Sequence, residues 1–411
     1  MPNDFNQYQP YTGFTTTSTG SVAQDLGQRY VTKSYLLDVY PNISSTIGNR
    51  TSPGLWMAGQ NGYGSLGIGR DDGNYSSPIQ VGTLTNWRQV NVGHLFTLAV
   101  KTNGTLWSWG YNTDTGGGPI GQLGLGDVVN RSSPVQVGTL TNWKQAAGGY
   151  HHSVAVKTDG TLWMWGHNNY GQLGQGNLTH RSSPIQVGSL TNWKQVSASR
   201  HSTVAIKTDG TLWTWGNNGS GQLGLGNTVS RSSPVQVGSL TNWKLVSSGV
   251  YYNLAVKTDG TLWSWGGDSY GVLGLSAVLT RSSPVQVGLL TDWKLVSAGT
   301  YSVSAIKTDG TLWMWGRNDY GNLGTGNLVH RSSPVQVGLL TNWKQVSTGG
   351  NQSAALKTDG TVWTWGWNPF GQLGVGDTVY RSSPTQVGSL TEWKQISCGW
   401  SQSSLIKDSS I

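Results

Sequence analysis

Tryptophan recurs along this chain with a period of about 50 residues, and this period limits the folds that the chain can adopt. The sequence contains 22 Trp, most of which occupy one of a few repeated positions. One series of repeated positions consists of Trp56, Trp107, Trp163, Trp213, Trp263, Trp313 and Trp363. A second series consists of Trp87, Trp143, Trp193, Trp243, Trp293, Trp343 and Trp393. Such a period is typical of propellers and solenoids.

Each repeat unit holds four short runs with the pattern of a β-strand, written in consensus as PVQV, WKQV, SxAVK and TLWTW. A Thr-Asp-Gly turn joins the last two runs, which is a strong hairpin signal. A glycine such as Gly210 supplies the positive φ that this turn needs. Four strands in each of seven units predict an all-β fold, a seven-bladed β-propeller of four-stranded blades.

The two ends of the chain predict how the ring closes. The last unit stops at SLIKDSSI and therefore lacks the returning TLWTW strand, whereas an isolated segment, SPGLWMAG, surrounds Trp56 near the other end. We expect this N-terminal strand near Trp56 to complete the last blade, because closure removes an open sheet edge. The chain then divides into an N-terminal arm, residues 1–51, and a propeller, residues 52–411.

The repeated motif resembles a known family. The combination GxLWxWGxNxxGQLGxG, followed by SSP and later by an AVKTDG turn, is similar to the regulator of chromosome condensation repeat family of seven-bladed propellers. This resemblance covers residues 52–411. The family includes a nuclear exchange factor for a small GTPase, secreted bacterial inhibitors of β-lactamase, and propellers used for adhesion or scaffolding. The resemblance therefore implies the fold and leaves the function open.

The sequence offers no recognisable catalytic or cofactor site. The GQLGxG run lacks the Lys and Ser/Thr of a phosphate loop and leads into no helical pattern, so we interpret it as a turn. The histidines do not have the spacing of metal ligands, Glu392 is the only glutamate, and Cys398 has no second cysteine to pair with. We expect a non-enzymatic protein with no metal and no cofactor.

The net charge of +8 comes mostly from basic residues that every unit repeats, including the turn lysines from Lys101 to Lys407. Because the repeats spread this charge around the ring, we expect it to be solvated on the blades and consider nucleic acid an unlikely partner. No apolar run is long enough to span a bilayer, and the first residues lack a signal-peptide pattern. We expect no membrane insertion.

The segments in which the repeats differ are the candidates for recognition. The three residues that follow each WKQVSxG run are rich in Tyr, His, Arg and Trp, which are common at binding hot spots. Trp367 belongs to a second variable position, directly after the WG that ends the TLWTW run. We expect a binding face formed by His94, Phe96, Tyr150, His151, His152, Arg200, His201, Tyr251, Tyr252, Tyr301, Asn351, Gln352, Trp400 and Trp367. The alternative is drift in loops without a binding role.

The N-terminal arm shares nothing with the repeat. Its segment DLGQRYVTKSYLLDVYP resembles N-terminal segments of virion structural proteins of tailed phages. This resemblance implies a virion protein, assembled in the host cytoplasm, whose arm docks on other virion proteins of the tail, neck or capsid. Its propeller would reinforce the particle or contact a host-surface protein or glycan. The expected anchoring residues are Leu26, Tyr30, Val31, Tyr35, Leu36, Leu37 and Tyr40.

Two other functions are compatible with the same sequence. The first is a bacterial propeller that acts as a protein-binding adaptor or inhibitor. The second is an exchange factor for a small GTPase, which we rank lower because the acidic and nucleic-acid-binding extensions expected of such a factor are missing from the sequence.

Overall fold

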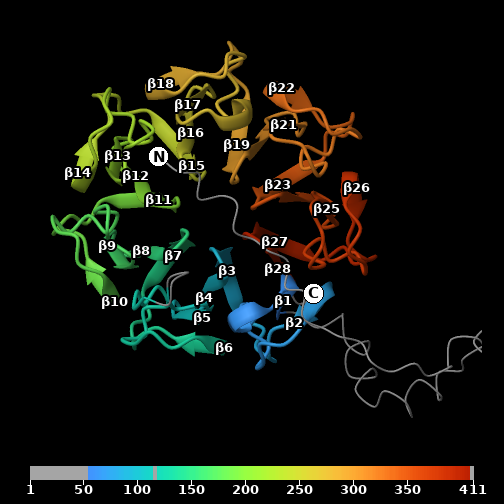
Figure 1. The fold of residues 1–411 in the computed structure, drawn as a ribbon, viewed down its shortest axis with the longest axis horizontal. Coiled ribbons are helices and arrows are strands. Elements are labelled where there is room, and N and C mark those ends of the chain that lie inside the picture. The colour runs from blue at the N-terminus through green and yellow to red at the C-terminus, as the bar shows by residue number, and fades with distance from the viewer. Residues whose placement is uncertain (1–53, 114–117, 408–411) are drawn as a thin grey trace, which may run out of the picture. The chain divides into compact units, whose positions relative to one another are not determined.

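The computed structural model describes residues 54–113 and 118–407. These residues form seven four-stranded antiparallel sheets, arranged as blades around a central axis (Figure 1). The predicted all-β, seven-bladed propeller is confirmed.

The innermost strand of each blade begins at a Trp of the second series and lies closest to the axis (Figure 1). The Trp is buried and the Lys or Arg that follows it is exposed, as Trp193 and Lys194 illustrate. The inner strands are β3 (Trp87–Val92), β7 (Trp143–Gly148), β11 (Trp193–Ala198), β15 (Trp243–Ser248), β19 (Trp293–Ala298), β23 (Trp343–Thr348) and β27 (Trp393–Cys398).

The second strand of each blade is buried along its whole length, because neighbouring blades cover it on both faces. One core cluster, for example, joins Val154 and Leu162 of one blade to Trp193 and Trp215 of the next, so the core lies between blades. The second strands are β4 (Phe96–Lys101), β8 (His152–Lys157), β12 (Ser202–Lys207), β16 (Tyr252–Lys257), β20 (Ser302–Lys307), β24 (Gln352–Lys357) and β28 (Gln402–Lys407).

The third strand carries the LWxWG run, and the outer strand carries the repeated Ser-Ser-Pro. Proline is tolerated in an edge strand, where its missing N–H interrupts no ladder. The third strands are β5 (Leu106–Gly110), β9 (Leu162–Gly166), β13 (Leu212–Gly216), β17 (Leu262–Gly266), β21 (Leu312–Gly316), β25 (Val362–Gly366) and β1 (Gly54–Gln60). The outer strands are β6 (Arg131–Gln136), β10 (Arg181–Gln186), β14 (Arg231–Gln236), β18 (Arg281–Gln286), β22 (Arg331–Gln336), β26 (Arg381–Gln386) and β2 (Asn74–Gln80).

The last blade is assembled from both ends of the described chain, in the order β2-β1-β28-β27. Strand β1 pairs with β28 from Gly54 opposite Lys407 to Gly59 opposite Gln402. The predicted closure by the strand near Trp56 is confirmed, and the structure adds that a second N-terminal strand, β2, forms the outer edge of the same blade.

Side chains join the inner strands from blade to blade. At the seam between the last blade and the first, Gln395 Nε2 donates to the Val90 carbonyl and Gln395 Oε1 accepts from the Val90 N–H, both at 3.2 Å. Two residues further, Ser397 Oγ accepts from the Val92 N–H at 3.2 Å. These bonds satisfy strand-edge groups that would otherwise be open to another chain.

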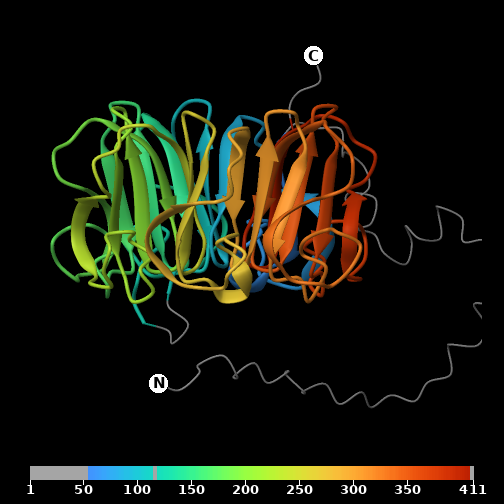
Figure 2. The same ribbon diagram turned by 90° about the horizontal axis from the view of Figure 1, so that it is seen from above.

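The strands run between two faces of the ring, which we call the loop face and the turn face. The loop face carries the turns between inner and second strands and the long loops that follow the third strands. It also carries the short 3₁₀ helices η1 (Gly62–Gly64) and η2 (Ser269–Gly271). The turn face carries the Thr-Asp-Gly turns. Figure 2 shows the ring from the side, with the loop face at the bottom.

The turn lysines are buried, which corrects the expectation that they are solvated. Lys207 is 5% exposed, and its Nζ lies 3.6 Å from the ring centre of Trp213 and 4.9 Å from that of Trp193. Burial lowers the pKa of Lys207, against a smaller opposing effect of Asp209. The indole faces stabilise the buried ammonium by cation–π attraction. The same contacts with two indoles recur at Lys101, Lys157, Lys257, Lys307 and Lys357.

The residues predicted to anchor the arm all lie outside the described residues: Leu26, Tyr30, Val31, Tyr35, Leu36, Leu37 and Tyr40. Within residues 54–113 and 118–407, no helix has the length and apolar character that a membrane span requires.

Trp215→Ala tests the packing between blades. The Trp215 side chain is 0% exposed, and its Nε1 donates across the seam to the Gln172 carbonyl at 2.8 Å. We expect the substitution to lower the free energy of unfolding by about 3–5 kcal/mol, because it leaves a cavity in the core. Urea denaturation measures this change. The matched control is Trp213→Ala, which should lower it less because the Trp213 ring is half-buried. Equal losses would contradict the burial argument.

Candidate functional site: the axial pocket

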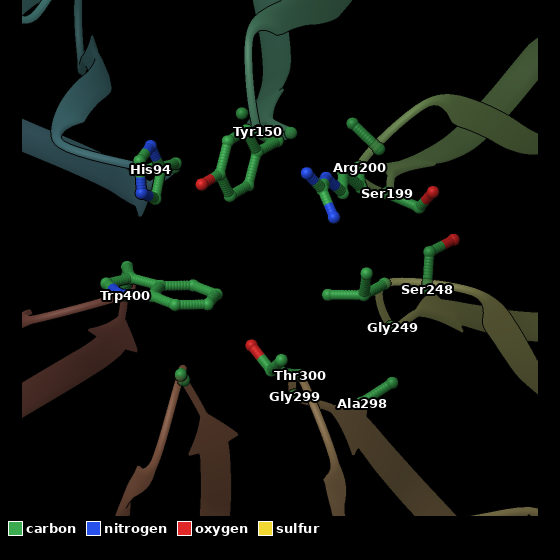
Figure 3. Close-up of a pocket in the computed structure, with 18 of the residues that line it drawn as sticks. His94, Tyr150, Ser199, Arg200, Ser248, Gly249, Ala298, Gly299, Thr300 and Trp400 are labelled. Atoms are coloured by element: carbon green, nitrogen blue, oxygen red, sulfur yellow. The ribbon is translucent and has the colours of Figure 1, made fainter. Parts of the chain in front are cut away.

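A pocket of about 110 Å³ lies where the loop-face turns of all seven blades converge on the axis (Figure 3). We call it the axial pocket. Its wall consists of the last residues of the inner strands and the first residue of each three-residue variable segment. These first-position residues are His94, Tyr150, Arg200, Val250, Thr300, Gly350 and Trp400.

Backbone hydrogen bonds between neighbouring turns hold first-position residues at the axis. The His94 N–H donates to the Gly149 carbonyl at 3.2 Å, and the Tyr150 N–H donates to the Ser199 carbonyl at 3.2 Å. The Thr300 N–H bonds the next blade in the same way, at 3.1 Å. Because the backbone makes these bonds, the side chain of a first-position residue can change while the turn stays at the axis.

The first-position side chains of blades near the ring closure form an aromatic and cationic cluster. His94 stacks on Tyr150 with ring centres 3.8 Å apart, and the Trp400 ring lies nearly perpendicular to both, at 5.3 and 5.9 Å. The Arg200 guanidinium lies 5.0 Å from the Tyr150 ring centre, and its Nη1 donates to the Tyr251 hydroxyl at 2.7 Å. Figure 3 shows Tyr150 between His94 and Arg200.

The opposite side of the axial pocket is lined by smaller residues. Val250, Thr300 and Gly350 occupy the same structural position there. The pocket is therefore asymmetric, with bulky recognition-type side chains over one part of its circumference and open space facing them.

The third-position residues of the variable segments are interior, and their prediction as part of a binding face is wrong. Phe96, His152, Tyr252 and Gln352 are between 0% and 2% exposed. They begin the second strands, so their side chains point into the seam between blades. The Tyr252 hydroxyl, for example, donates to the Gly299 carbonyl of the next blade at 3.0 Å.

The second-position residues lie away from the axis and contact the long loops of the loop face. The predicted site residues of this group are His151, His201, Tyr251, Tyr301 and Asn351. The His201 ring lies 4.8 Å from that of Tyr170, and the Tyr301 ring lies 5.4 Å from that of Tyr270. The structure therefore places the second-position residues between the axial pocket and the loops.

Trp367 is not part of the axial pocket. Its half-buried ring lies 5.3 Å from Phe370 and 6.2 Å from Tyr320. It belongs to a separate aromatic cluster on the loop face, in which Arg317 lies over Tyr270 and Tyr320 at 5.1 and 5.6 Å.

The sequence reasoning missed one repeated set of loop-face aromatics. An aromatic residue precedes the first glycine of the GQLG run or its equivalent in five of the loops, and these side chains are exposed or half-buried. The signal that identifies them is the recurring Tyr-Gly or Phe-Gly pair. The residues are Tyr63, Tyr170, Tyr270, Tyr320 and Phe370.

His94 and His201 are neutral at pH 7. Burial holds the pKa of His94 well below its usual value, and repulsion from His151 and Arg200 adds to this effect. Burial lowers the pKa of His201 to about 3, again assisted by Arg200. None of the residues that line the pocket carries a carboxylate.

The described residues contain no cluster of three or more His, Cys, Asp or Glu side chains placed to hold a metal ion. Cys398 lies at the wall of the axial pocket, where burial raises the pKa of its thiol to about 11. The thiol is thus protonated near neutral pH and is a poor nucleophile.

Larger clefts lie on the outer rim, but they are a product of the repeat. Three of them, of about 560, 510 and 380 Å³, have equivalent linings between the outer strands of adjacent blades. Trp263 and Pro284 form the wall in one case, and the corresponding Trp and Pro form it in the others. Because these linings repeat, the axial pocket is the more distinctive site.

Comparison with protein families gives consistent matches. A model of the RCC1-like domain matches residues 115–410, and models of the regulator of chromosome condensation (RCC1) repeat match residues 54–100 and 87–114. Together these matches extend over the whole ring of blades.

Individual relatives match over shorter stretches. The RCC1 domain-containing protein RUG3, mitochondrial, of Arabidopsis thaliana is 32% identical over 174 residues, which are 39% of this chain and 37% of that protein. The ultraviolet-B receptor UVR8 of Arabidopsis thaliana is 32% identical over 125 residues, 29% of this chain and 27% of that protein. The chain thus matches about a third of the length of these relatives.

Among solved structures, Prp20p of Saccharomyces cerevisiae, described with its binding to Gsp1p and histones, has a similar fold. The TM-score is 0.76 at 20% identity, over 88% of this chain and 93% of that chain. This likeness concerns the fold.

His152→Gln tests the electrostatics beneath the axial pocket. Burial, with smaller effects of His167 and His151, lowers the pKa of His152 to about 3, from an ordinary value of about 6.5. Below pH 6.5 the unfolded chain therefore takes up a proton that the folded protein does not, so stability falls from pH 6.5 toward pH 3. The protonation of this one residue lowers the free energy of unfolding by about 2 kcal/mol between pH 7 and pH 5.

The glutamine variant should lose correspondingly less stability on acidification, as measured by urea denaturation at pH 7 and pH 5. Glutamine fits this position, since Gln352 occupies the equivalent site and bonds the Gly399 and Gln402 carbonyls. Identical pH dependence in the two proteins would refute the assignment of a neutral, buried His152.

Proposed function

The chain belongs to the regulator of chromosome condensation (RCC1) repeat family, and we propose on that basis that it is a non-catalytic propeller that binds a protein partner through its loop face. The observation that carries the proposal is the gathering of variable, half-buried Tyr, His, Arg and Trp side chains on this one face. Such residues supply large contact area at low cost in conformational entropy and are frequent at binding hot spots.

The rigidity of the scaffold supports this proposal. The long loops of the loop face are held by repeated Asn side chains: Asn168 Oδ1 accepts from the Leu173 N–H at 2.9 Å, and its Nδ2 donates to two carbonyls further along the loop. A loop fixed in this way loses little entropy on binding, which favours affinity.

Relatives of this fold also support protein binding. Prp20p is described with its binding to Gsp1p and histones, so at least one RCC1-like propeller binds proteins. We extend to this chain the general role, a protein-binding propeller, and leave the identity of the partner open.

The absence of reactive groups from the lining of the axial pocket supports a non-catalytic role. General acid–base chemistry needs groups whose pKa lies near the working pH. Here burial keeps His94 neutral and the Cys398 thiol protonated, and the lining contains no Asp or Glu.

The role as a virion structural protein is a separate proposal, which depends on the N-terminal arm. It is compatible with a loop face that contacts a host-surface protein, and the adaptor role is compatible with the same face. The two roles differ in what residues 1–51 do.

Site-specific photocrosslinking tests the loop face as the binding surface. A photoreactive residue at Tyr170 or Tyr320, both on the loop face, should crosslink the full-length protein to the same partner in lysate of the producing cells, as identified by mass spectrometry. The matched control is Leu289, which lies on the turn face and is 92% exposed. Crosslinking to that partner from Leu289 alone, or equally from all three positions, would contradict the proposal.

Deletion of residues 1–51 tests the virion role. The truncated protein should no longer be found in purified particles by mass spectrometry, because the arm would hold it there. Residues 54–407 contain the whole ring of blades, so its circular dichroism spectrum should remain that of the folded propeller. Truncated protein found in particles at the full-length level would rule out anchoring by the arm.

A further inference from the structure

We propose that the axial pocket is a carboxylate-binding site, in which the Arg200 guanidinium receives an Asp or Glu side chain from an acidic segment of the partner. This inference rests on the proposed protein-binding function and deepens it, because it assigns the chemical class of the group that enters the pocket.

The first argument is the charge balance of the axial pocket. Arg200 lies at its wall, and no residue of the lining carries a carboxylate. No salt bridge of the described residues involves Arg200. Arg131 pairs with Asp127 and Arg381 pairs with Asp377. Other arginines resemble Arg200 in having no salt bridge among the described residues, but they lie outside the lining of the axial pocket: Arg181, Arg231, Arg281 and Arg331. Arg200 therefore carries a positive charge that no acidic side chain of the ring neutralises.

Arg317 offers the sharpest comparison within the molecule. Both guanidinium groups lie on tyrosine rings, Arg200 on Tyr150 at 5.0 Å and Arg317 on Tyr270 at 5.1 Å. Arg317 Nε, however, donates to the carboxylate of Asp319. Both arginines are thus supported by a tyrosine ring, but only Arg317 also has a carboxylate of this protein as its partner. This contrast points to a carboxylate from another molecule as the partner of Arg200.

The second argument is a set of unused donors. Arg200 Nε and His94 Nδ1 are buried and have no hydrogen-bond partner among the described residues. A buried polar atom without a partner costs about 1–3 kcal/mol, so a ligand that bonds it recovers that energy. A carboxylate matches the planar fork of a guanidinium with two parallel hydrogen bonds.

The third argument is that the guanidinium is already in place. The Tyr150 ring supports it by cation–π attraction, and its Nη1 donates to the Tyr251 hydroxyl at 2.7 Å. An arginine held in this way does not have to be ordered on binding, which improves affinity.

The size of the axial pocket favours the end of a side chain. Its volume of about 110 Å³ is well below the roughly 300 Å³ of the smaller sites that hold drug-sized ligands. Val250, Thr300 and Gly350 leave the side facing Arg200 open to such a group. A protein segment can insert one carboxylate and lay its remaining residues on the loop-face aromatics.

The neutral His94 predicts how binding depends on pH. The groups around it are His151, Arg200, Tyr150 and Trp400, none of which is acidic. A bound carboxylate favours the protonated imidazole, so binding raises the pKa of His94 and takes up a proton. By linkage, affinity for a carboxylate increases as the pH is lowered.

The test uses the full-length protein and a blocked hexa-glutamate peptide, with a hexa-glutamine peptide as the neutral control, in isothermal titration at pH 8.0 and pH 6.0. The protein should bind hexa-glutamate, more tightly at pH 6.0, and should not bind hexa-glutamine. Arg200→Gln should weaken hexa-glutamate binding at least tenfold. Arg317→Gln, which removes the same charge from the matched arginine, should change it less than twofold. His94→Gln should remove the pH dependence.

Several outcomes would overturn the carboxylate site. The first is that hexa-glutamate does not bind to a protein whose melting temperature shows it to be folded. The second is that Arg200→Gln and Arg317→Gln weaken hexa-glutamate binding equally. The third is that the two peptides bind equally well. Binding of inorganic phosphate or a sialylated oligosaccharide through Arg200, without binding of the peptide, would overturn the peptide class. If crosslinking from Tyr170 persists in Arg200→Gln while no peptide binds, the carboxylate site fails and the protein-binding loop face stands.

Discussion

The propeller depends on how the inner edge of each blade is satisfied. The inner strands are sheet edges that face the next blade at an angle, so their N–H and C=O groups cannot all join a continuous ladder. The repeat WKQVS supplies the partners: Gln395 bonds both backbone groups of Val90, and Ser397 bonds the N–H of Val92. Equivalent bonds run from Gln89 to Ala146. Repeated polar residues thus take the place of a neighbouring strand at each of these seams and bond one blade to the next.

This constraint also explains why the asymmetric site lies at the axis. The seam fixes the inner strands, and the turns that follow them bond one another through backbone atoms, as His94 does with Gly149. The side chain at the first turn position is then not needed to hold the turn, yet its position is always at the wall of the axial pocket. Seven such positions converge, so the differences among repeats accumulate in one small pocket. A ring of near-identical units can therefore present a single, unsymmetrical recognition site.

Much of this architecture is readable from the sequence, because strand periodicity, turn residues and the unpaired last hairpin are local signals. Two features are not. The alternation of residues along a strand does not show whether other blades cover one face of the strand or both. The sequence therefore predicts a solvated Lys207, although Trp193 and Trp213 enclose its ammonium group. The sequence also offers no reason to separate the three variable residues of each turn, so it predicts that all three are exposed. Because the chain turns between them, Arg200 reaches the axis while Tyr252 and its equivalents begin a buried strand.

The contrast between Arg200 and Arg317 shows what the ring does with positive charge. Charges in repeated positions are either stabilised within the protein, as Lys207 is by two indoles, or exposed to solvent, as Lys194 is. Arg317 departs from the repeat but is neutralised by Asp319 beside it. Arg200 departs from the repeat without such a neighbour, and it lies in the axial pocket, to whose wall every blade contributes. Burial keeps His94 neutral, and repulsion from His151 and Arg200 adds to this effect, whereas a bound anion would favour the protonated imidazole. The protonation of His94 is therefore coupled to the binding of an anion in the axial pocket. This coupling needs residues from several blades, so a single blade does not have it.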